Sequence, residues 1–238
     1  MKKRVLGATI AIATAAITYS TGSAWAGSVK GKAMFAGAPP QRRQIQMSAD
    51  PKCEAANPNG RLGEVYVIKD GALQNVFVYV KEGLQGKTFP VPAESVELDQ
   101  NGCMYAPHVA GLMVGQELML KNGDDTLHNV HALPEKSKQF NNAMPMKDMT
   151  IKKKFTSAEV MVRFKCDVHP WMSAYVGVLE HPFYAVSGAD GTFEIKNLPA
   201  GTYTIEAWHE AAGTQTQQVT VTDEGSVTAD FSFKQQGT

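Results

Sequence analysis

The sequence predicts an all-β protein built from small β-sandwiches, and three observations support this prediction. Short apolar runs recur along the chain, each bounded by turn residues. Glycine and proline are frequent, with 21 and 12 in 238 residues, so turns are easily formed. Beyond the N-terminal apolar stretch, no segment has the pattern of a helix of ten or more residues. Many short strands separated by turns are typical of β-sandwiches.

The first 26 residues have the three parts of a secretory signal peptide. Basic residues at 2–4 precede a small, apolar stretch at 5–19, and Ala-Trp-Ala at 24–26 is a cleavage site. The apolar stretch is shorter than the roughly 18 to 20 residues that a membrane span requires. We therefore expect a Sec-type signal, a mature chain beginning at Gly27, no membrane span after cleavage, and localisation in a bacterial periplasm.

The charge balance excludes a strong electrostatic attraction to nucleic acid. Lysine plus arginine and aspartate plus glutamate both number 23. Removing three basic residues with the signal leaves 20 basic against 23 acidic residues, a net charge of −3. Hydrophobic residues make up 43% of the chain, enough for a buried core and too many for wholesale disorder.

Three cysteines are too few for a disulfide-stapled miniprotein, and they fall into two kinds. In an oxidising compartment, Cys53 and Cys103 can form a disulfide across a separation of 50 residues (103 − 53). Closing a loop of this length would stabilise the folded protein by at most roughly 4 kcal/mol. The alternatives are two buried free thiols, or a second metal site that joins Cys103 to His108. Cys166 has different neighbours, and we expect it to stay a free thiolate.

The strongest chemical signal is a Cys-x2-His-x2-Met motif formed by Cys166, His169 and Met172. His128 lies 38 residues upstream of the cysteine (166 − 128), where a predicted strand begins after a turn. Two imidazoles and a thiolate in a trigonal plane, with a weak axial thioether, are the ligands of a blue copper site. The motif therefore predicts one type 1 copper ion per chain.

Two other interpretations of the same motif are weaker. Zinc sites rarely use methionine, and structural ones usually recruit more than one cysteine. A catalytic cysteine would need an orienting Asn or Asp partner and an oxyanion loop, and neither is evident. We therefore do not expect an enzyme.

The segment from about residue 92 to residue 180 resembles the cupredoxins, and among them the amicyanin and plastocyanin groups. The motifs that carry the resemblance are found at residues 114–116, 122, 128–131, 144–147, 162–165 and 166–172. The resemblance implies a Greek-key β-sandwich whose equatorial copper ligands are His128, Cys166 and His169 and whose axial ligand is Met172. It also implies that Asn129 hydrogen-bonds the ligand loop and that Pro170 stiffens it.

The sequence departs from these groups at two positions. Leu127 and Val168 stand where proline usually precedes a ligand histidine. These two departures affect the expected reduction potential of the copper site and the rigidity of the ligand loop, and they leave the ligand set intact.

The same resemblance implies a carrier of single electrons. Its partners would be redox proteins, such as a c-type cytochrome or a periplasmic dehydrogenase or oxidase. The alternative is a periplasmic copper chaperone or copper-tolerance protein that transfers the ion itself. We expect an exposed His169, with an apolar collar that includes Met144, Met146 and Met149 as the docking surface; a Cu(I) site on these methionines is the alternative.

The tail carries a second set of motifs. Asp-Gly-x-Phe-x-Ile at 190–195 and Leu-Pro-x-Gly-x-Tyr-x-Ile at 198–205 resemble the carboxypeptidase regulatory-like, or transthyretin-like, β-sandwich. The tail alone is too short for a sandwich, and predicted head strands at 29–35 and 71–80 can supply what is missing. The alternative is that the head extends the cupredoxin sheet.

These observations predict four segments. They are a signal peptide at 1–26, the first part of the transthyretin-like sandwich at 27–91, a cupredoxin domain at 92–181, packed with or inserted into the second sandwich, and the remaining transthyretin-like strands at 182–238.

Overall fold

The computed structural model describes residues 27–236, and the predicted signal peptide lies outside the described residues. The described chain consists almost entirely of β-strands, with one six-residue helix, so the predicted all-β sandwich class is confirmed. Within residues 27–236, no helix has the length and apolar character needed to cross a membrane.

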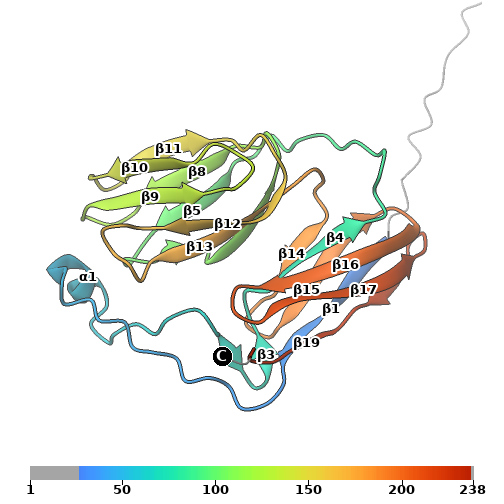
Figure 1. Cartoon of the computed structure of the whole chain (residues 1–238), viewed down its shortest axis with the longest axis horizontal. Helices are drawn as coiled ribbons and strands as arrows, with labels where there is room; N and C mark the ends of the chain where they lie inside the picture. Colours follow the sequence, from blue (N-terminus) through green and yellow to red (C-terminus); the bar gives the residue numbers. More distant parts are fainter. Residues whose placement is uncertain (1–26, 237–238) are drawn as a thin grey trace, which may run out of the picture.

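Two β-sandwiches lie beside each other (Figure 1), and strands from both ends of the chain build one of them, which we call the flanking sandwich. Its strands are β1 (Gly27–Phe35), β2 (Ile68–Lys69), β3 (Ala72–Leu73), β4 (Phe77–Glu82), β14 (Tyr184–Val186), β15 (Thr192–Leu198), β16 (Gly201–His209), β17 (Gly213–Val221), β18 (Ser226–Thr228) and β19 (Phe231–Phe233). In one sheet, β1 pairs antiparallel with β15 and β3 and parallel with β18 and β19. The other sheet has the order β14-β4-β16-β17. Head strands β1 and β4 are therefore held by tail strands.

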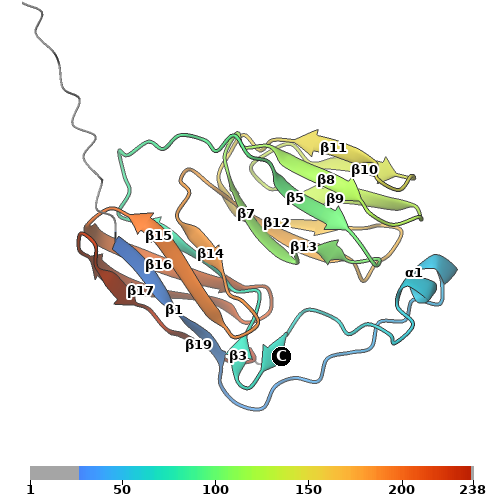
Figure 2. The same ribbon diagram turned by 180° about the vertical axis from the view of Figure 1, so that it is seen from behind.

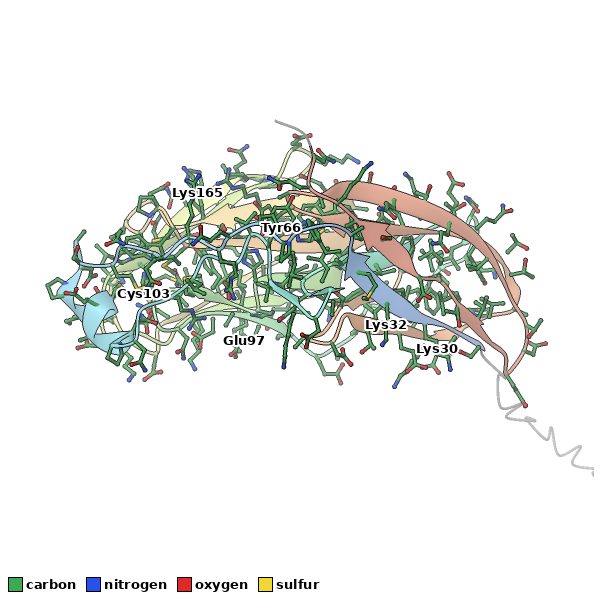
Figure 3. The ribbon with its side chains drawn as sticks, turned by 90° about the horizontal axis from the view of Figure 1, so that it is seen from below. Lys30, Lys32, Tyr66, Glu97, Cys103 and Lys165 are labelled. Atoms are coloured by element: carbon green, nitrogen blue, oxygen red, sulfur yellow. A yellow bond between two sulfur atoms is a disulfide. The ribbon has the colours of Figure 1, made fainter. Side chains whose placement is uncertain are left out.

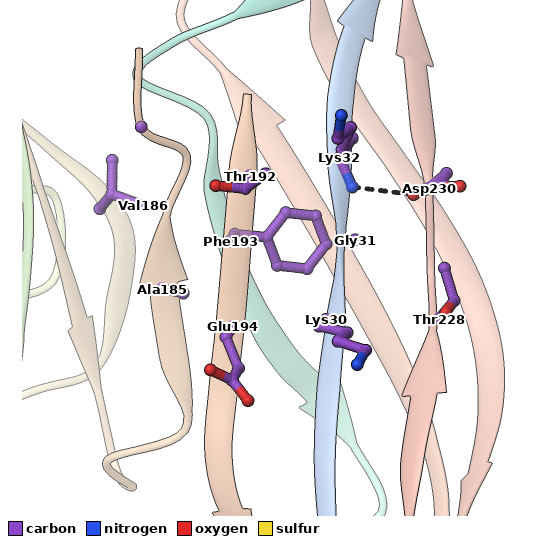
Figure 4. Close-up of a pocket in the computed structure, with 11 residues that line it drawn as sticks. Lys30, Gly31, Lys32, Ala185, Val186, Thr192, Phe193, Glu194, Thr228 and Asp230 are labelled. Atoms are coloured by element: carbon purple, nitrogen blue, oxygen red, sulfur yellow. Dashed lines mark hydrogen bonds between the residues drawn. The ribbon is translucent and has the colours of Figure 1, made fainter. Parts of the chain in front are cut away.

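Close packing in the flanking sandwich depends on a glycine in β1. The ring of Phe193 on β15 points across Gly31 of β1 (Figure 4). A Cβ atom at Gly31 would lie 2.0 Å from the carbonyl oxygen of Ala229 and 3.0 Å from the Phe193 ring, so only glycine fits without movement. Gly31 and Phe193 border a pocket of about 800 Å³ that is also lined by Lys30 and Asp230. The predicted copper ligands do not line this pocket.

The second sandwich, which we call the inserted sandwich, lies in the sequence between β4 and β14. Its strands are β5 (Val96–Gln100), β6 (Tyr105–Ala106), β7 (Val109–Met113), β8 (Leu118–Asn122), β9 (His128–Leu133), β10 (Phe140–Met144), β11 (Thr150–Lys153), β12 (Glu159–Lys165) and β13 (Ser173–Leu179). One sheet has the order β10-β9-β12-β13-β7 and the other β11-β8-β5-β6. Leu98, Leu120, Val130, Phe164 and Val176 are fully buried between them, which follows from apolar residues at alternate positions of each strand.

The two sandwiches meet through an apolar contact. Phe77 of β4 packs against Gly177 of β13, where a Cβ atom would lie 2.3 Å from the ring. Tyr184 stacks on Phe77 and donates a hydrogen bond from its hydroxyl to the carbonyl oxygen of Gly111 at 2.5 Å. Val109 and Leu179 complete the buried cluster.

A polar contact adjoins this cluster. The buried His108 of the inserted sandwich donates through Nδ1 to the carbonyl oxygen of Ser173 at 3.1 Å and through Nε2 to Glu210 of the flanking sandwich at 2.5 Å. Glu64 lies 3.6 Å from its Nδ1. His108 therefore links the two sandwiches.

The segment of residues 36–67, which we call the head segment, leaves the flanking sandwich after β1 and returns to it at β2. It extends along the outside of the molecule to the far end of the inserted sandwich, where it forms helix α1 (Pro51–Ala56) (Figures 1 and 2). Figure 3 shows Cys103 beside α1 and Tyr66 near the junction of the two sandwiches. The head segment thus brings residues of the chain's first quarter to the end of the inserted sandwich.

The His108–Glu210 contact should make stability depend on pH. Burial alone lowers the pKa of His108, but the hydrogen bond and charge of Glu210 and the charge of Glu64 raise it above its ordinary value of 6.5. The stabilisation is therefore complete below pH 6.5 and is lost as pH rises through the folded-state pKa. We expect His108→Gln to lower the free energy of unfolding at pH 6 by about 2 kcal/mol.

Urea unfolding at pH 6 and pH 9 measures this effect. The wild type should lose more stability than His108→Gln between the two values. Equal losses in both proteins would contradict the assignment.

Candidate metal centre

The start of β9 and the loop between β12 and β13 bring the predicted ligands together at one end of the inserted sandwich. His128 is the first residue of β9, and Cys166 directly follows β12. His169 lies in the loop between β12 and β13, and Met172 directly precedes β13. β9 and β12 are paired neighbours in one sheet, so the upstream histidine lies beside the loop that holds the others.

The donor atoms of the two histidines and the cysteine converge. The Nδ1 atoms of His128 and His169 are 2.9 Å apart, and the Cys166 Sγ is 3.8 Å from the His169 Nδ1. The three residues are buried, with exposures of 0% for His128, 1% for Cys166 and 2% for His169. Met172 is fully buried in the same apolar cluster as Cys166.

This donor set fits one metal ion. The three ligand atoms lie within 4.8 Å of one another. Bonds of about 2.0–2.1 Å to nitrogen and 2.3 Å to sulfur place donors of one ion at most about 4.4 Å apart, and both observed contacts satisfy this limit. Imidazole and thiolate donors suit copper, zinc or iron, and the neighbouring thioether favours copper.

Asn129 holds the ligand loop against β9. Its Oδ1 accepts from the backbone N–H of Asp167 at 2.7 Å and of Val168 at 3.4 Å. Its Nδ2 donates to the Asp167 carboxylate at 3.1 Å and to Asn141 at 2.5 Å. Asn129 therefore connects the start of β9 to the ligand loop.

The ligand loop is also closed on itself. The Cys166 N–H donates to the carbonyl oxygen of Met172 at 3.2 Å, and the Met172 N–H donates to that of His169 at 2.9 Å. Pro170 lies within this turn and is exposed. The cysteine, the second histidine and the methionine are therefore connected by backbone hydrogen bonds as well as by sequence.

A carboxylate accepts a hydrogen bond from the Nε2 atom of each histidine. The Nε2 of His128 donates to Asp124 at 2.9 Å, and the Nε2 of His169 donates to Asp50 at 3.0 Å. Histidine ligands commonly donate their second nitrogen to such a partner, which fixes the tautomer and raises ligand basicity. The Nδ1 lone pairs are thereby left for the interior of the site.

The electrostatics favour a charged ligand cluster. Burial works against charge on His128, but hydrogen bonds and charges of Asp124 and Cys166 raise the His128 pKa to about 9. Burial likewise raises the pKa of the Cys166 thiol, and hydrogen bonds from His128 and from the backbone at Asn129 lower it below the ordinary value. A proton on His128 and a thiolate at Cys166 therefore stabilise each other, and a cation can replace that proton.

The expectation that His169 is exposed was wrong. Its ring lies under Asp50 and the Cys53 sulfur, which is 3.6 Å from Nε2, and beside Trp171, with ring centroids 5.1 Å apart. The head segment covers the histidine, and the short ligand motif contains no sign of this. Of the residues expected to form an apolar collar, Met146 is 65% exposed, whereas Met144 is fully buried.

The predicted pairing of Cys53 with Cys103 is confirmed, with the two sulfurs 1.98 Å apart. Cys166 is the free cysteine among the described residues. The disulfide joins α1 to the loop before β6, so Cys103 is separate from His108, whose ring nitrogens contact Glu210, Glu64 and a backbone carbonyl. His131 contacts Asp167 at 2.9 Å and is not part of the ligand cluster.

The sequence analysis missed Asp50 and Asp124. Two signals could have indicated them. Asp50-Pro51 is a helix start, with an N-cap residue and proline at N1, which places an ordered carboxylate three residues before Cys53. Asp124 lies four residues before a predicted ligand histidine, in the turn between β8 and β9.

Comparison with protein families confirms the resemblance predicted for the tail. Residues 169–234 match the carboxypeptidase regulatory-like domain, which is less than a third of the chain. The match begins in the ligand loop and includes β13 of the inserted sandwich, whereas the tail part of the flanking sandwich begins at β14. A comparison with curated proteins gives no significant match.

Solved structures similar to this chain include cupredoxins. A purple cupredoxin from Nitrosopumilus maritimus has 19% identity and a TM-score of 0.31, covering 35% of this chain and 98% of its own. An amicyanin mutant with Cu(I) has 20% identity and a TM-score of 0.33, covering 42% of this chain and 97% of its own. A copper-containing nitrite reductase from Thermus scotoductus has 16% identity and a TM-score of 0.35, covering 42% of this chain and 26% of its own. All three TM-scores are below 0.5, so these likenesses carry no argument about the site.

Replacing Asn129 should loosen the ligand loop. Asn129→Ala removes the acceptor of two loop N–H groups and leaves them unpaired, so we expect the free energy of unfolding to fall by about 1–3 kcal/mol. Asn142→Ala is the control, because the Asn142 side-chain oxygen is buried without a hydrogen bond. Urea unfolding of both variants measures the difference, and an equal effect would contradict the role of Asn129.

Proposed function

We propose that this protein is a type 1 copper protein that carries single electrons between redox partners in the periplasm. The observation that carries the proposal is the buried convergence of the Cys166 thiolate with the Nδ1 atoms of His128 and His169. A thiolate with two imidazoles is the equatorial ligand set of blue copper sites.

The residues have distinct roles in this proposal. His128, Cys166 and His169 would hold the ion, and the Met172 thioether would be a weaker fourth ligand. Copper supplies a one-electron couple between Cu(I) and Cu(II). The hydrogen bonds of Asn129 and the backbone contacts of the loop keep the ligands in place in both oxidation states.

The burial of the ligands supports an electron carrier over a chaperone. A chaperone transfers its ion by ligand exchange, which requires a partner's donor atom to reach the metal. Here the three ligand residues are at most 2% exposed, and the Nε2 atoms of both histidines donate hydrogen bonds to carboxylates. An electron needs no such access.

The proposed partners follow from this role. They are redox proteins such as a c-type cytochrome or a periplasmic dehydrogenase or oxidase, and we assign no catalytic residue to this chain. The signal-like sequence at residues 1–26 supports export to the periplasm.

Cysteine replacement tests the ligand assignment. The copper-loaded, oxidised wild type should be intensely blue, because thiolate bonding to Cu(II) gives a strong visible absorption. Cys166→Ser should lose this band and keep the fold, which depends on the sandwich core. A visible spectrum and a circular dichroism spectrum measure the two results, and an intensely blue serine variant would refute the assignment.

Replacement of the axial ligand tests Met172 separately. Met172→Gln should keep copper and lower the reduction potential, because a harder oxygen donor favours Cu(II). Voltammetry of the loaded variant measures the potential. Complete loss of copper from Met172→Gln would show that Met172 is not a weak axial ligand.

A further inference from the structure

The carboxylate of Asp50 joins helix α1 to the proposed ligand His169. Its Oδ1 accepts the backbone N–H of Lys52 at 2.9 Å, which caps the first turn of α1. Its Oδ2 accepts from the hydroxyl of Thr126 at 2.8 Å and from the Nε2 of His169 at 3.0 Å. The Cys53 N–H is a fourth partner, at 3.4 Å from Oδ1. Both oxygens of Asp50 therefore act only as acceptors, as those of an ionised carboxylate do.

Asp124 makes the corresponding contact with the other histidine, His128. It accepts from the backbone N–H groups of Gly102 at 2.7 Å and Cys103 at 2.8 Å, and from the Nε2 of His128 at 2.9 Å. Each carboxylate thus holds one of the two imidazoles, and each lies beside one cysteine of the disulfide. Asp124 lies in a turn of the inserted sandwich, whereas Asp50 comes from the head segment.

Several contacts hold the head segment in this position. Cys53 is bonded to Cys103, so the disulfide links the backbone groups that donate to the two carboxylates. Asn57 also donates to the carbonyl oxygen of Gly102 at 3.0 Å. The ion pair of Lys52 with Asp125 at 3.0 Å is solvent-exposed on both partners and adds little to this attachment. The disulfide and the Asn57 hydrogen bond therefore attach the head segment to the inserted sandwich shortly after Asp50 in the sequence.

We infer that Asp50 is a positioning residue for the proposed metal centre, and that the head segment completes this centre. Asp50 fixes the Nε2–H tautomer of His169, directs Nδ1 to the metal position and places a negative charge one imidazole away from the ion. It also closes the outer edge of His169 to solvent. The inference rests on the proposed copper function for its effect on the metal, but the Asp50–His169 contact can be tested without metal.

Three variants separate the hydrogen bond from the charge. Asp50→Asn removes the charge but retains an acceptor and a good N-cap residue, so the helix should persist. Asp50→Ala removes the charge, the acceptor and the cap. Asp125→Asn is the matched control, because it removes the same charge at a site that is 82% exposed and does not contact a histidine.

The first measurement uses the full-length metal-free protein. Long-range ¹H–¹⁵N NMR of the imidazoles should show His169 protonated at Nε2 in the wild type and in Asp125→Asn. In Asp50→Ala the proton should redistribute between the two ring nitrogens, and Asp50→Asn should be intermediate. Circular dichroism and thiol counting confirm that each variant is folded with its disulfide intact.

The second measurement uses the protein loaded with Cu(II). Competition with a chelator should show affinity about 10–100-fold weaker in Asp50→Ala, a smaller loss in Asp50→Asn and no loss in Asp125→Asn. The reduction potential should rise in both Asp50 variants, because the lost negative charge had favoured Cu(II).

Each outcome bears on a separate claim. If both Asp50 variants match Asp125→Asn in tautomer, affinity and potential, the inference is refuted. If the wild type forms no blue copper site but Asp50→Ala still changes the His169 tautomer, the proposed function fails while the positioning role of Asp50 is supported.

Discussion

A buried imidazole can present one ring nitrogen to a metal only if the other nitrogen has a partner, and this requirement organises the proposed metal centre. His128 and His169 are both buried, and a carboxylate accepts the Nε2–H of each. Once the Nε2 atoms are engaged, the two Nδ1 atoms face each other and the Cys166 sulfur. The acceptor of His169 belongs to the head segment, so the disulfide and the helix cap are needed to keep it there.

This requirement also explains how the two sandwiches divide their roles. The inserted sandwich provides the sulfur, both imidazoles and one carboxylate. The flanking sandwich provides no donor atom, but both ends of the head segment start from its strands β1 and β2. The apolar contact of Phe77 with Gly177 and the link from His108 to Glu210 keep the two units together, so the head segment extends between two held points.

The sequence predicted those features whose residues lie close together in the chain and form a recognisable pattern. Alternating apolar residues predicted the all-β class, and the residues from Cys166 to Met172 form one loop whose donors converge with His128. The compartment and the count of cysteines predicted the disulfide between Cys53 and Cys103. Asp50 was not predicted, because it lies 119 residues from His169 in a polar, turn-rich segment without a motif of its own. Burial of His169 is likewise a property of that long-range contact, so the local pattern, which suggested an exposed ring, gave the wrong answer.

The split of the flanking sandwich sets an order in which the molecule can be completed. β1 pairs with β15, and the partner of Gly27 in this pair is Leu198, which is 171 positions later in the chain (198 − 27). β1 can therefore form this pair only after most of the chain has been made. All strands of the inserted sandwich, both cysteines of the disulfide and Asp50 precede β14 in the sequence. During synthesis the head segment and the inserted sandwich precede the tail strands. The proposed metal centre can therefore assemble before the tail strands are available. Closure of the flanking sandwich then comes last, and its long-range pairing makes it the slower step. A truncated chain that lacks the tail would leave β4 without a partner strand and β1 with β3 alone, while retaining every proposed copper ligand.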